Sequence, residues 1–220
     1  KFTAQQSTTA PVGFVNSLKI TSSSAYTVAA GDIFGVYQRI EGTNITDLAW
    51  GSANAKTITV SFWVYSSLTG TFGGSLRNSA GNRSYPFSYT ISSANTWEQK
   101  SITITGDTTG TWLTTNGVGI YLQFGLGVGT TYSGTAGSWA GANYLSATGA
   151  TSVVGTNGAT FYITGVQLEK GATATPFENR LYGTELALCQ RYYQQRILSL
   201  VSASSQVNAN QYSNRAYPTM

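Results

Sequence analysis

Apolar and polar residues alternate one by one along several short segments of this chain, a pattern typical of half-buried β-strands. In Thr57–Tyr65 the apolar positions of one side are Ile58, Val60, Phe62 and Val64. The segment Val118–Leu126 repeats the pattern and carries Tyr121 and Gln123 on the side opposite its apolar residues. Each segment therefore predicts a strand with one face in a core.

Five more segments alternate in this way between turns rich in Gly, Asn and Ser: Ser17–Thr21, Ile33–Ile40, Tyr85–Ile91, Ser101–Thr105 and Phe161–Leu168. In the last of them the apolar positions shift after Gly165, which predicts a β-bulge at this glycine. The run LRNSAGNRS, with Arg77 and Arg83, reads as a polar hairpin tip. About eight strands with no helical pattern between them predict an all-β, two-sheet sandwich, and we favour a jelly-roll-like topology.

The pattern changes near the C-terminus. Thr184 is placed to cap a helix over Glu185–Gln195, with an acidic residue in its first turn. We therefore divide the chain into a β-sandwich over 1–170, a linker over 171–183, a helix over 184–197 and an extension over 198–220. The extension is expected to pack on a neighbouring subunit or to continue into further chain.

A lone helix of this length is marginally stable in water and needs a partner. Its apolar residues Leu186, Cys189 and Tyr193 follow one another at helical spacing. We expect these three residues to form an oligomer interface. Because Cys189 is the single cysteine, no disulfide can form within one chain.

Two longer stretches interrupt the strands. Asp107–Gly117 carries Trp112, and Gly127–Gly158 carries Tyr132, Trp139 and Tyr144 among many small residues. A loop as long as the second one is uncommon inside a compact domain and usually serves binding or assembly. The sequence leaves both roles open.

The amino-acid composition limits the classes of function that we expect. Charged residues make up only 9% of the chain, against about a quarter in an ordinary domain. The net charge of +4 is scattered rather than gathered in a basic run, so nucleic-acid binding is not expected. No stretch approaches the ~20 consecutive apolar residues that span a membrane, so membrane insertion is not expected either.

The chain has no histidine, which removes the common catalytic triads and the commonest metal ligand. Its eight carboxylates show no close pair on one strand face of the kind that glycosidases use. We therefore expect a non-enzymatic protein without catalytic residues or a metal centre. A structural calcium ion is the one cofactor left open, with Asp32, Glu41 or Asp47 as single oxygen donors.

Aromatic residues are the best candidates for ligand contacts. Fourteen tyrosines and five tryptophans supply flat faces with polar edges, which suit the apolar faces and hydroxyl groups of sugar rings. Trp139 is the leading candidate, either as a sugar platform or as a residue that packs its loop on the domain or a neighbour. We place Tyr132 and Tyr144 beside it. Trp63 and Trp97 lie in or beside strands and are expected to pack, whereas Trp112 is open to both roles.

A second candidate surface is the face of the predicted strands that points away from the core. Tyr121 and Gln123 on one strand and Tyr37 and Arg39 on another are expected to share this face. Together they would form a glycan-binding sheet face or a subunit interface.

Several blocks of the sequence, in order, resemble a family of phage and prophage tail-fibre or virion-appendage proteins. The longest block is ITGVQLEKG…ATPFENRLYGTELALCQRYYQ, and the others are TAPVGFVNSLKIT, FGVYQRIEG, FGGSLRNSAGNRSYPFSYTI, NTWEQKSITI, GTWLTTNGVGI and GTAGSWAGANY. The resemblance covers most of Gln5–Gln194. It implies a jelly roll like those of carbohydrate-binding modules, carried on a homotrimeric viral fibre.

The resemblance suggests a non-enzymatic virion protein, a receptor-binding domain that attaches to bacterial surface polysaccharide. Its expected partners are two further copies of itself, other virion proteins and the glycan, and its expected location is the virion. Two alternatives stay open. One is a purely structural capsid decoration, collar or fibre-shaft element, and the other is a component of a polysaccharide depolymerase.

Overall fold

The computed structural model describes residues 1–193, and the chain divides into two units, 1–177 and 178–220. The expected extension over 198–220 and the end of the expected helix lie outside the described residues. Within residues 1–193, no helix has the length and apolar character needed to cross a membrane.

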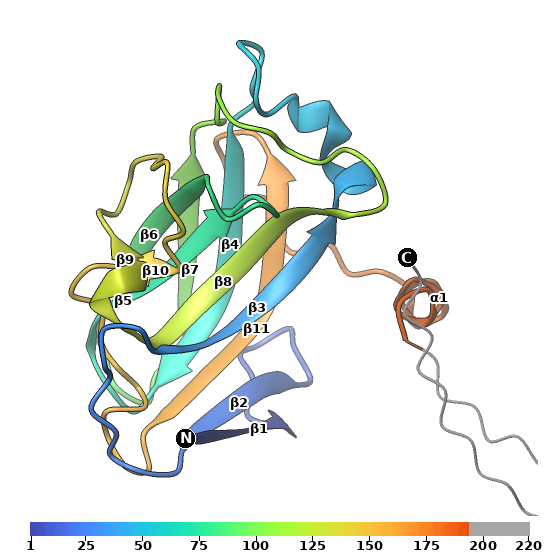
Figure 1. Cartoon of the computed structure of the whole chain (residues 1–220). Helices are drawn as coiled ribbons and strands as arrows, with labels where there is room; N and C mark the ends of the chain where they lie inside the picture. Colours follow the sequence, from blue (N-terminus) through green and yellow to red (C-terminus); the bar gives the residue numbers. More distant parts are fainter. Residues whose placement is uncertain (194–220) are drawn as a thin grey trace, which may run out of the picture. The chain divides into compact units, whose positions relative to one another are not determined.

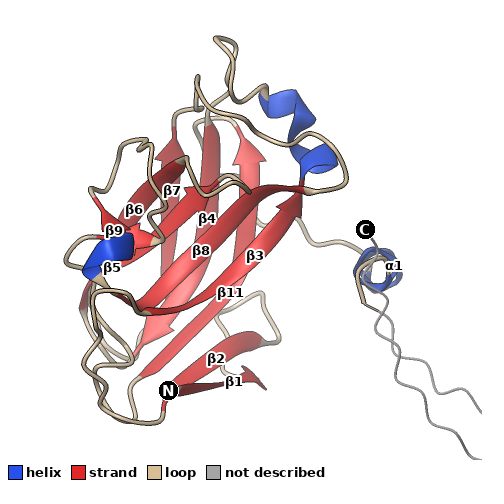
Figure 2. Cartoon of the chain, viewed as in Figure 1, coloured by secondary structure: helices blue, strands red, loops and turns tan. Residues whose placement is uncertain are grey.

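The first unit consists of two antiparallel sheets laid face to face (Figures 1 and 2). Sheet A has the order β1 (Phe2–Ser7), β2 (Ser17–Ser22), β11 (Thr160–Lys170), β4 (Ile58–Ser66) and β7 (Glu98–Ile104). Sheet B has the order β3 (Ile33–Glu41), β8 (Val118–Val128), β5 (Gly70–Arg77) and β6 (Ser84–Ile91). The chain passes back and forth between the sheets, so the predicted jelly-roll-like sandwich is confirmed.

Short elements lie between the main strands. They are the 3₁₀ helices Gly42–Leu48 and Thr130–Tyr132 and the parallel pair β9 (Ser133–Gly134) and β10 (Ser146–Ala147). The last three belong to the long loop that follows β8.

The core lies between the sheets and contains the residues that the alternation predicted. Ile58, Val60, Phe62 and Val64 of β4 are fully buried. The ring of Phe62 meets two rings of sheet B edge-on, Tyr89 at 5.0 Å and Phe124 at 4.9 Å between centroids. Such edge-to-face contacts add about 0.5–1.5 kcal/mol to the burial of the rings.

The predicted bulge in β11 is confirmed. The register of β11 against β4 shifts between Thr164 and Gln167, and Gly165 between them has a φ of +59°. A Cβ on Gly165 would lie 2.5 Å from Cζ of Phe14, so a side chain here would meet both backbone strain and a clash.

The first half of the expected linker belongs to the sandwich. Gly171 donates its N–H to the Thr57 carbonyl, and its own carbonyl accepts from Oγ1 of Thr59. Thr103 likewise bonds the carbonyl of Ala172. The boundary between the two units of the chain lies later, after Phe177.

Helix α1 runs over Tyr182–Gln190 and begins earlier than predicted. Leu181 occupies the N-cap position, and its carbonyl accepts the first helical bond from the N–H of Glu185. Thr184 lies inside the first turn and caps nothing, so the expectation of a Thr184 cap was wrong. Glu185 does lie in the first turn, as predicted.

Replacing Phe62 with alanine tests the core. The change removes a fully buried ring and leaves a cavity between the sheets, so we expect a loss of about 3–5 kcal/mol in the free energy of unfolding, measured in urea. Val12 is fully exposed, and Val12→Ala should change this free energy by no more than about 0.5 kcal/mol. Equal effects of the two substitutions would contradict the packing described.

Candidate functional site

The outward residues of sheet B form rows across three strands. Because Ile120, Leu122 and Phe124 of β8 point into the core, Tyr121 and Gln123 point out. Strand register then places β3 and β5 residues beside them. The rows are Arg39, Tyr121 and Arg77, then Tyr37, Gln123 and Ser75, and then Gly35 and Gly125. Gly73 of β5 lies beside Gly125, where a Cβ would be 3.3 Å from the Gly73 carbonyl oxygen.

Part of the long loop packs against Gly73 and Gly125. A Cβ on Gly73 would lie 2.4 Å from Oγ of Ser146, and one on Gly125 would lie 2.7 Å from the same atom. The loop therefore lies directly on the backbone of β5 and β8, which only glycine permits at these positions. One row further on, Ser75 donates a hydrogen bond of 2.7 Å to the carbonyl of Tyr144.

The same loop is tied to the edge of sheet B. Ser84 of β6 and Ala140 exchange backbone hydrogen bonds, and Oγ of Ser84 donates to the carbonyl of Ala142. In Figure 1 the loop lies beside β5 and β6. Part of the Gly127–Gly158 loop thus packs on its own domain, and it leaves the β3 half of the outer face open.

We call this open part the β3–β8 face and define it by Tyr37, Arg39, Arg77, Tyr121 and Gln123. The side chains of Tyr37 and Arg39 are exposed, whereas Tyr121 and Arg77 are partly buried and Gln123 is buried. The two tyrosine rings lie 6.0 Å apart between centroids. The prediction that Tyr37, Arg39, Tyr121 and Gln123 share one outward face is confirmed by the strand register.

Both arginines border the ring of Tyr121. The guanidinium carbon of Arg77 lies 4.1 Å from the ring centroid and that of Arg39 lies 5.7 Å from it. Burial lowers the pKa of Arg77, the tyrosines Tyr121 and Tyr37 oppose this effect, and the charge of Arg39 adds to it. The group stays protonated at neutral pH.

Sequence reasoning placed Arg77 in a hairpin tip and missed it as a member of this face. The hairpin is present, since β5 ends at Arg77 and β6 begins at Ser84. Its place as the last residue of a strand, in step with outward Ser75, is the signal that could have identified its direction.

Trp139 lies in a cluster of three tryptophans. Its ring meets Trp50 at 5.3 Å and Trp112 at 5.5 Å, and its Nε1 donates to the Thr105 carbonyl at 2.7 Å. Tyr85 packs on it as well. Of the roles open to Trp139, these contacts favour packing of the loop on the domain. Trp112 is also buried, and sequence reasoning did not single out Trp50.

Tyr144 and Tyr132 stabilise the shape of the loop. The Tyr144 ring lies on Gly134, where a Cβ would be 2.3 Å from Cδ2. The carbonyl of Tyr132 accepts a hydrogen bond from the N–H of Leu145. Within residues 1–193, no ring contact joins either residue to Tyr37 or Tyr121.

Another aromatic cluster lies on the outer face of sheet A. Tyr65 meets Trp97 at 5.5 Å and Tyr162 at 4.9 Å, and Nζ of Lys19 lies 5.6 Å from the centroid of Tyr162. Tyr162 is buried and the other two rings are partly buried. Trp97 therefore packs against two neighbouring rings.

Most carboxylates that the structure describes have partners. Asp107 is buried and pairs with Arg83 at 2.6 Å. Burial alone would raise the pKa of Asp107, but bonds from Arg83, Thr109 and Trp112 together lower it. Glu98 pairs with Lys100.

Of the residues proposed for calcium, Asp47 pairs with Lys170, and Asp32 accepts the N–H of Ala29. The described residues contain no group of three or more His, Cys, Asp or Glu side chains that would hold a metal ion.

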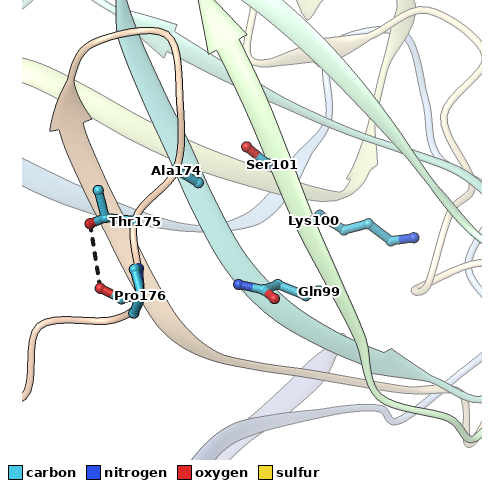
Figure 3. Close-up of a pocket in the computed structure, with 6 residues that line it drawn as sticks. All are labelled: Gln99, Lys100, Ser101, Ala174, Thr175 and Pro176. Atoms are coloured by element: carbon cyan, nitrogen blue, oxygen red, sulfur yellow. Dashed lines mark hydrogen bonds between the residues drawn. The ribbon is translucent and has the colours of Figure 1, made fainter.

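A shallow pocket lies where the segment after β11 passes β7 (Figure 3). Its lining residues are Gln99, Lys100, Ser101, Ala174, Thr175 and Pro176. Lys100 is ion-paired with Glu98. The pocket offers small polar groups and no aromatic ring.

No protein-family model and no curated protein matches the chain. Solved structures of similar fold include the CBM22-2 xylan-binding domain of Paenibacillus barcinonensis Xyn10C, with 16% identity over 77% of this chain and 91% of that one, at a TM-score of 0.39. A family 11 carbohydrate-binding module of Clostridium thermocellum gives 13% identity, 80% and 85% coverage and a TM-score of 0.39.

The tailspike protein 4 enzymatically active domain of bacteriophage CBA120 gives 13% identity over 77% of this chain and a TM-score of 0.39. This chain spans only 18% of that domain. All of these likenesses concern the fold and assign no residue of the site.

Substitution of Trp139 tests whether this residue packs the loop on the domain. We expect Trp139→Ala to lower the free energy of unfolding by about 3 kcal/mol, because three ring contacts are lost. Trp139→Phe keeps a ring and loses one hydrogen bond, at a cost of about 1 kcal/mol. Both values can be measured by denaturant unfolding. A Trp139→Ala variant of unchanged stability would contradict the packing role.

Proposed function

We propose that this chain is a non-enzymatic glycan-binding domain of a phage virion appendage and that its binding surface is the β3–β8 face. The observation that carries the proposal is the pair Tyr37 and Tyr121, neighbouring rings on a part of sheet B that the loop leaves uncovered. Most other aromatic side chains of the sandwich are engaged in core or loop packing.

The face has the chemistry that sugars require. An exposed tyrosine ring offers an apolar surface for the C–H face of a sugar, and its hydroxyl remains free for hydrogen bonds at the edge. The guanidinium groups of Arg39 and Arg77 add several N–H donors for sugar hydroxyls. Because the side chains stand on paired strands, their spacing is held by the backbone ladder.

The virion setting is supported by the sequence blocks that resemble tail-fibre and appendage proteins. A single sugar site of this size binds weakly. Several copies on one appendage make the second contact with a bacterial surface intramolecular, which raises the overall affinity by orders of magnitude. Non-enzymatic action is supported by the ion pairs and hydrogen bonds that engage Asp107, Glu98, Asp47 and Glu169.

Self-association through α1 is part of the proposal. Every residue of this helix is exposed in the single chain, and the interface residues Leu186 and Cys189 lie three positions apart on one side. Tyr193 follows four positions after Cys189, and its N–H donates a hydrogen bond to the Cys189 carbonyl. An isolated helix this short is unstable in water, which favours a partner from another copy. A purely structural virion role would rest on this same association.

Substitution of the tyrosines tests the binding surface. We expect Tyr121→Ala and Tyr37→Ala each to weaken binding to a bacterial surface polysaccharide about tenfold, since half of a ring's burial is worth about 1.4 kcal/mol. The measurement is titration calorimetry against a panel of such polysaccharides. Tyr65→Ala, on the outer face of sheet A, is the matched control. Loss of binding in the control alone would move the site to the other sheet.

The mass of the particle in solution tests the association. We expect light scattering to give the mass of three chains, and we expect Leu186→Glu to lower it because a charge enters the proposed interface of α1. Thr184→Glu places the same charge on another side of the helix and should leave the mass unchanged. A monomeric wild-type chain would contradict association.

A further inference from the structure

The two arginines of the β3–β8 face are not neutralised by the protein. The ion pairs of residues 1–193 involve other cations, Arg83, Lys100, Lys170 and Arg180, and none includes Arg39 or Arg77. The four strands of sheet B contain one carboxylate, Glu41 at the end of β3. The face is therefore positively charged in a chain whose surface is otherwise poor in charge.

Both arginines lie near the Tyr121 ring, Arg77 closer than Arg39. Strand register pairs Tyr121 with Arg39 on β3 and with Arg77 on β5, so the three side chains form a single row. Neighbouring strands lie about 4.8 Å apart, and each guanidinium borders the same aromatic ring. A sugar bound beside this row would thus have two cations next to it.

Two like charges beside one ring raise the energy of the empty face. Burial lowers the pKa of Arg77, the tyrosines Tyr121 and Tyr37 oppose this effect, and the charge of Arg39 adds to it. An anionic group bound between the guanidinium groups would remove this repulsion, and a neutral sugar would not. The arrangement therefore gains more from an acidic ligand than from a neutral one.

Polar atoms next to Arg77 have unused hydrogen-bonding capacity. Among the described residues, Nε of Arg77 and Oδ1 of Asn143 are buried and have no hydrogen-bond partner. Both side chains border Gly81, where a Cβ would lie 3.5 Å from Nη1 of Arg77 and 3.3 Å from Oδ1 of Asn143. A buried group without a partner costs about 1–3 kcal/mol, so the described residues leave the guanidinium group of Arg77 incompletely satisfied.

We infer that the β3–β8 face selects glycans whose sugars carry carboxylate groups, with Arg39 and Arg77 as the cations that bind the carboxylate of a sugar held against Tyr37 and Tyr121. This inference rests on the glycan-binding function proposed above. The planar fork of arginine matches a carboxylate with two parallel hydrogen bonds, which makes it specific as well as attractive.

The test uses the full chain and a panel of bacterial capsular polysaccharides, half of them containing uronic acids and half neutral. Each acidic polysaccharide is also presented after chemical reduction of its carboxyl groups to alcohols. We expect binding to the uronic-acid members, at least a tenfold loss after carboxyl reduction, and a marked weakening between 50 mM and 500 mM salt.

Single substitutions test whether Arg39 and Arg77 bind the carboxylate. Arg39 is exposed, so Arg39→Gln should leave the fold intact and weaken binding to the acidic polysaccharide about tenfold, while Arg39→Lys should retain part of the affinity. Arg77→Gln should act in the same direction, with thermal unfolding as a check on its fold. Lys56 is exposed and distant in sequence, and Lys56→Gln makes the same change in net charge as a control.

The outcomes separate the two proposals. Binding to neutral members that carboxyl reduction and Arg39→Gln leave unchanged would overturn the selectivity for carboxylates and keep glycan binding. An equal effect of Lys56→Gln and Arg39→Gln would also overturn it, since the attraction would then come from net charge alone. Absence of binding to every member would overturn glycan binding itself.

Discussion

The contact between the two sheets at Phe62 is the constraint on which the rest of the structure depends. This ring of β4 lies edge-on against Tyr89 of β6 and Phe124 of β8. It therefore packs the two sheets against each other at a defined position. Since side chains alternate along a strand, fixing Phe124 inward also fixes Tyr121 and Gln123 outward. The direction of the candidate site is therefore a consequence of the core.

The outer face of sheet B is divided by side-chain size. Gly125 and Gly73 give the long loop room to lie on the backbone, and Ser75 anchors it by a hydrogen bond. On β3 the outward side chains of Tyr37 and Arg39 are large, and the loop leaves them exposed. The outer face of sheet B is thus divided into a part that packs within the domain and a part that is exposed.

A cluster of three tryptophans and one ion pair packs at one end of the sandwich. Trp50, Trp112 and Trp139 pack edge-on, and the buried pair of Arg83 and Asp107 lies against them, with Nε1 of Trp112 donating to the carboxylate. A buried ion pair stabilises only when its hydrogen bonds are satisfied, and Asp107 accepts bonds from three residues. Through Trp139, this cluster packs part of the long loop on the sandwich.

The sequence by itself determined most of the main strands and their inward faces, the bulge at Gly165 and the outward direction of Tyr121 and Gln123, but it missed β1 and β5. These features follow from local periodicity, which the chain carries residue by residue. Strand order, the seating of the long loop and the role of Trp139 were decided only by tertiary structure. Contacts such as those of Trp139 with Trp50 and Trp112, or of Arg77 with Tyr121, join residues far apart in the chain, and no local pattern encodes which distant partner a side chain will meet.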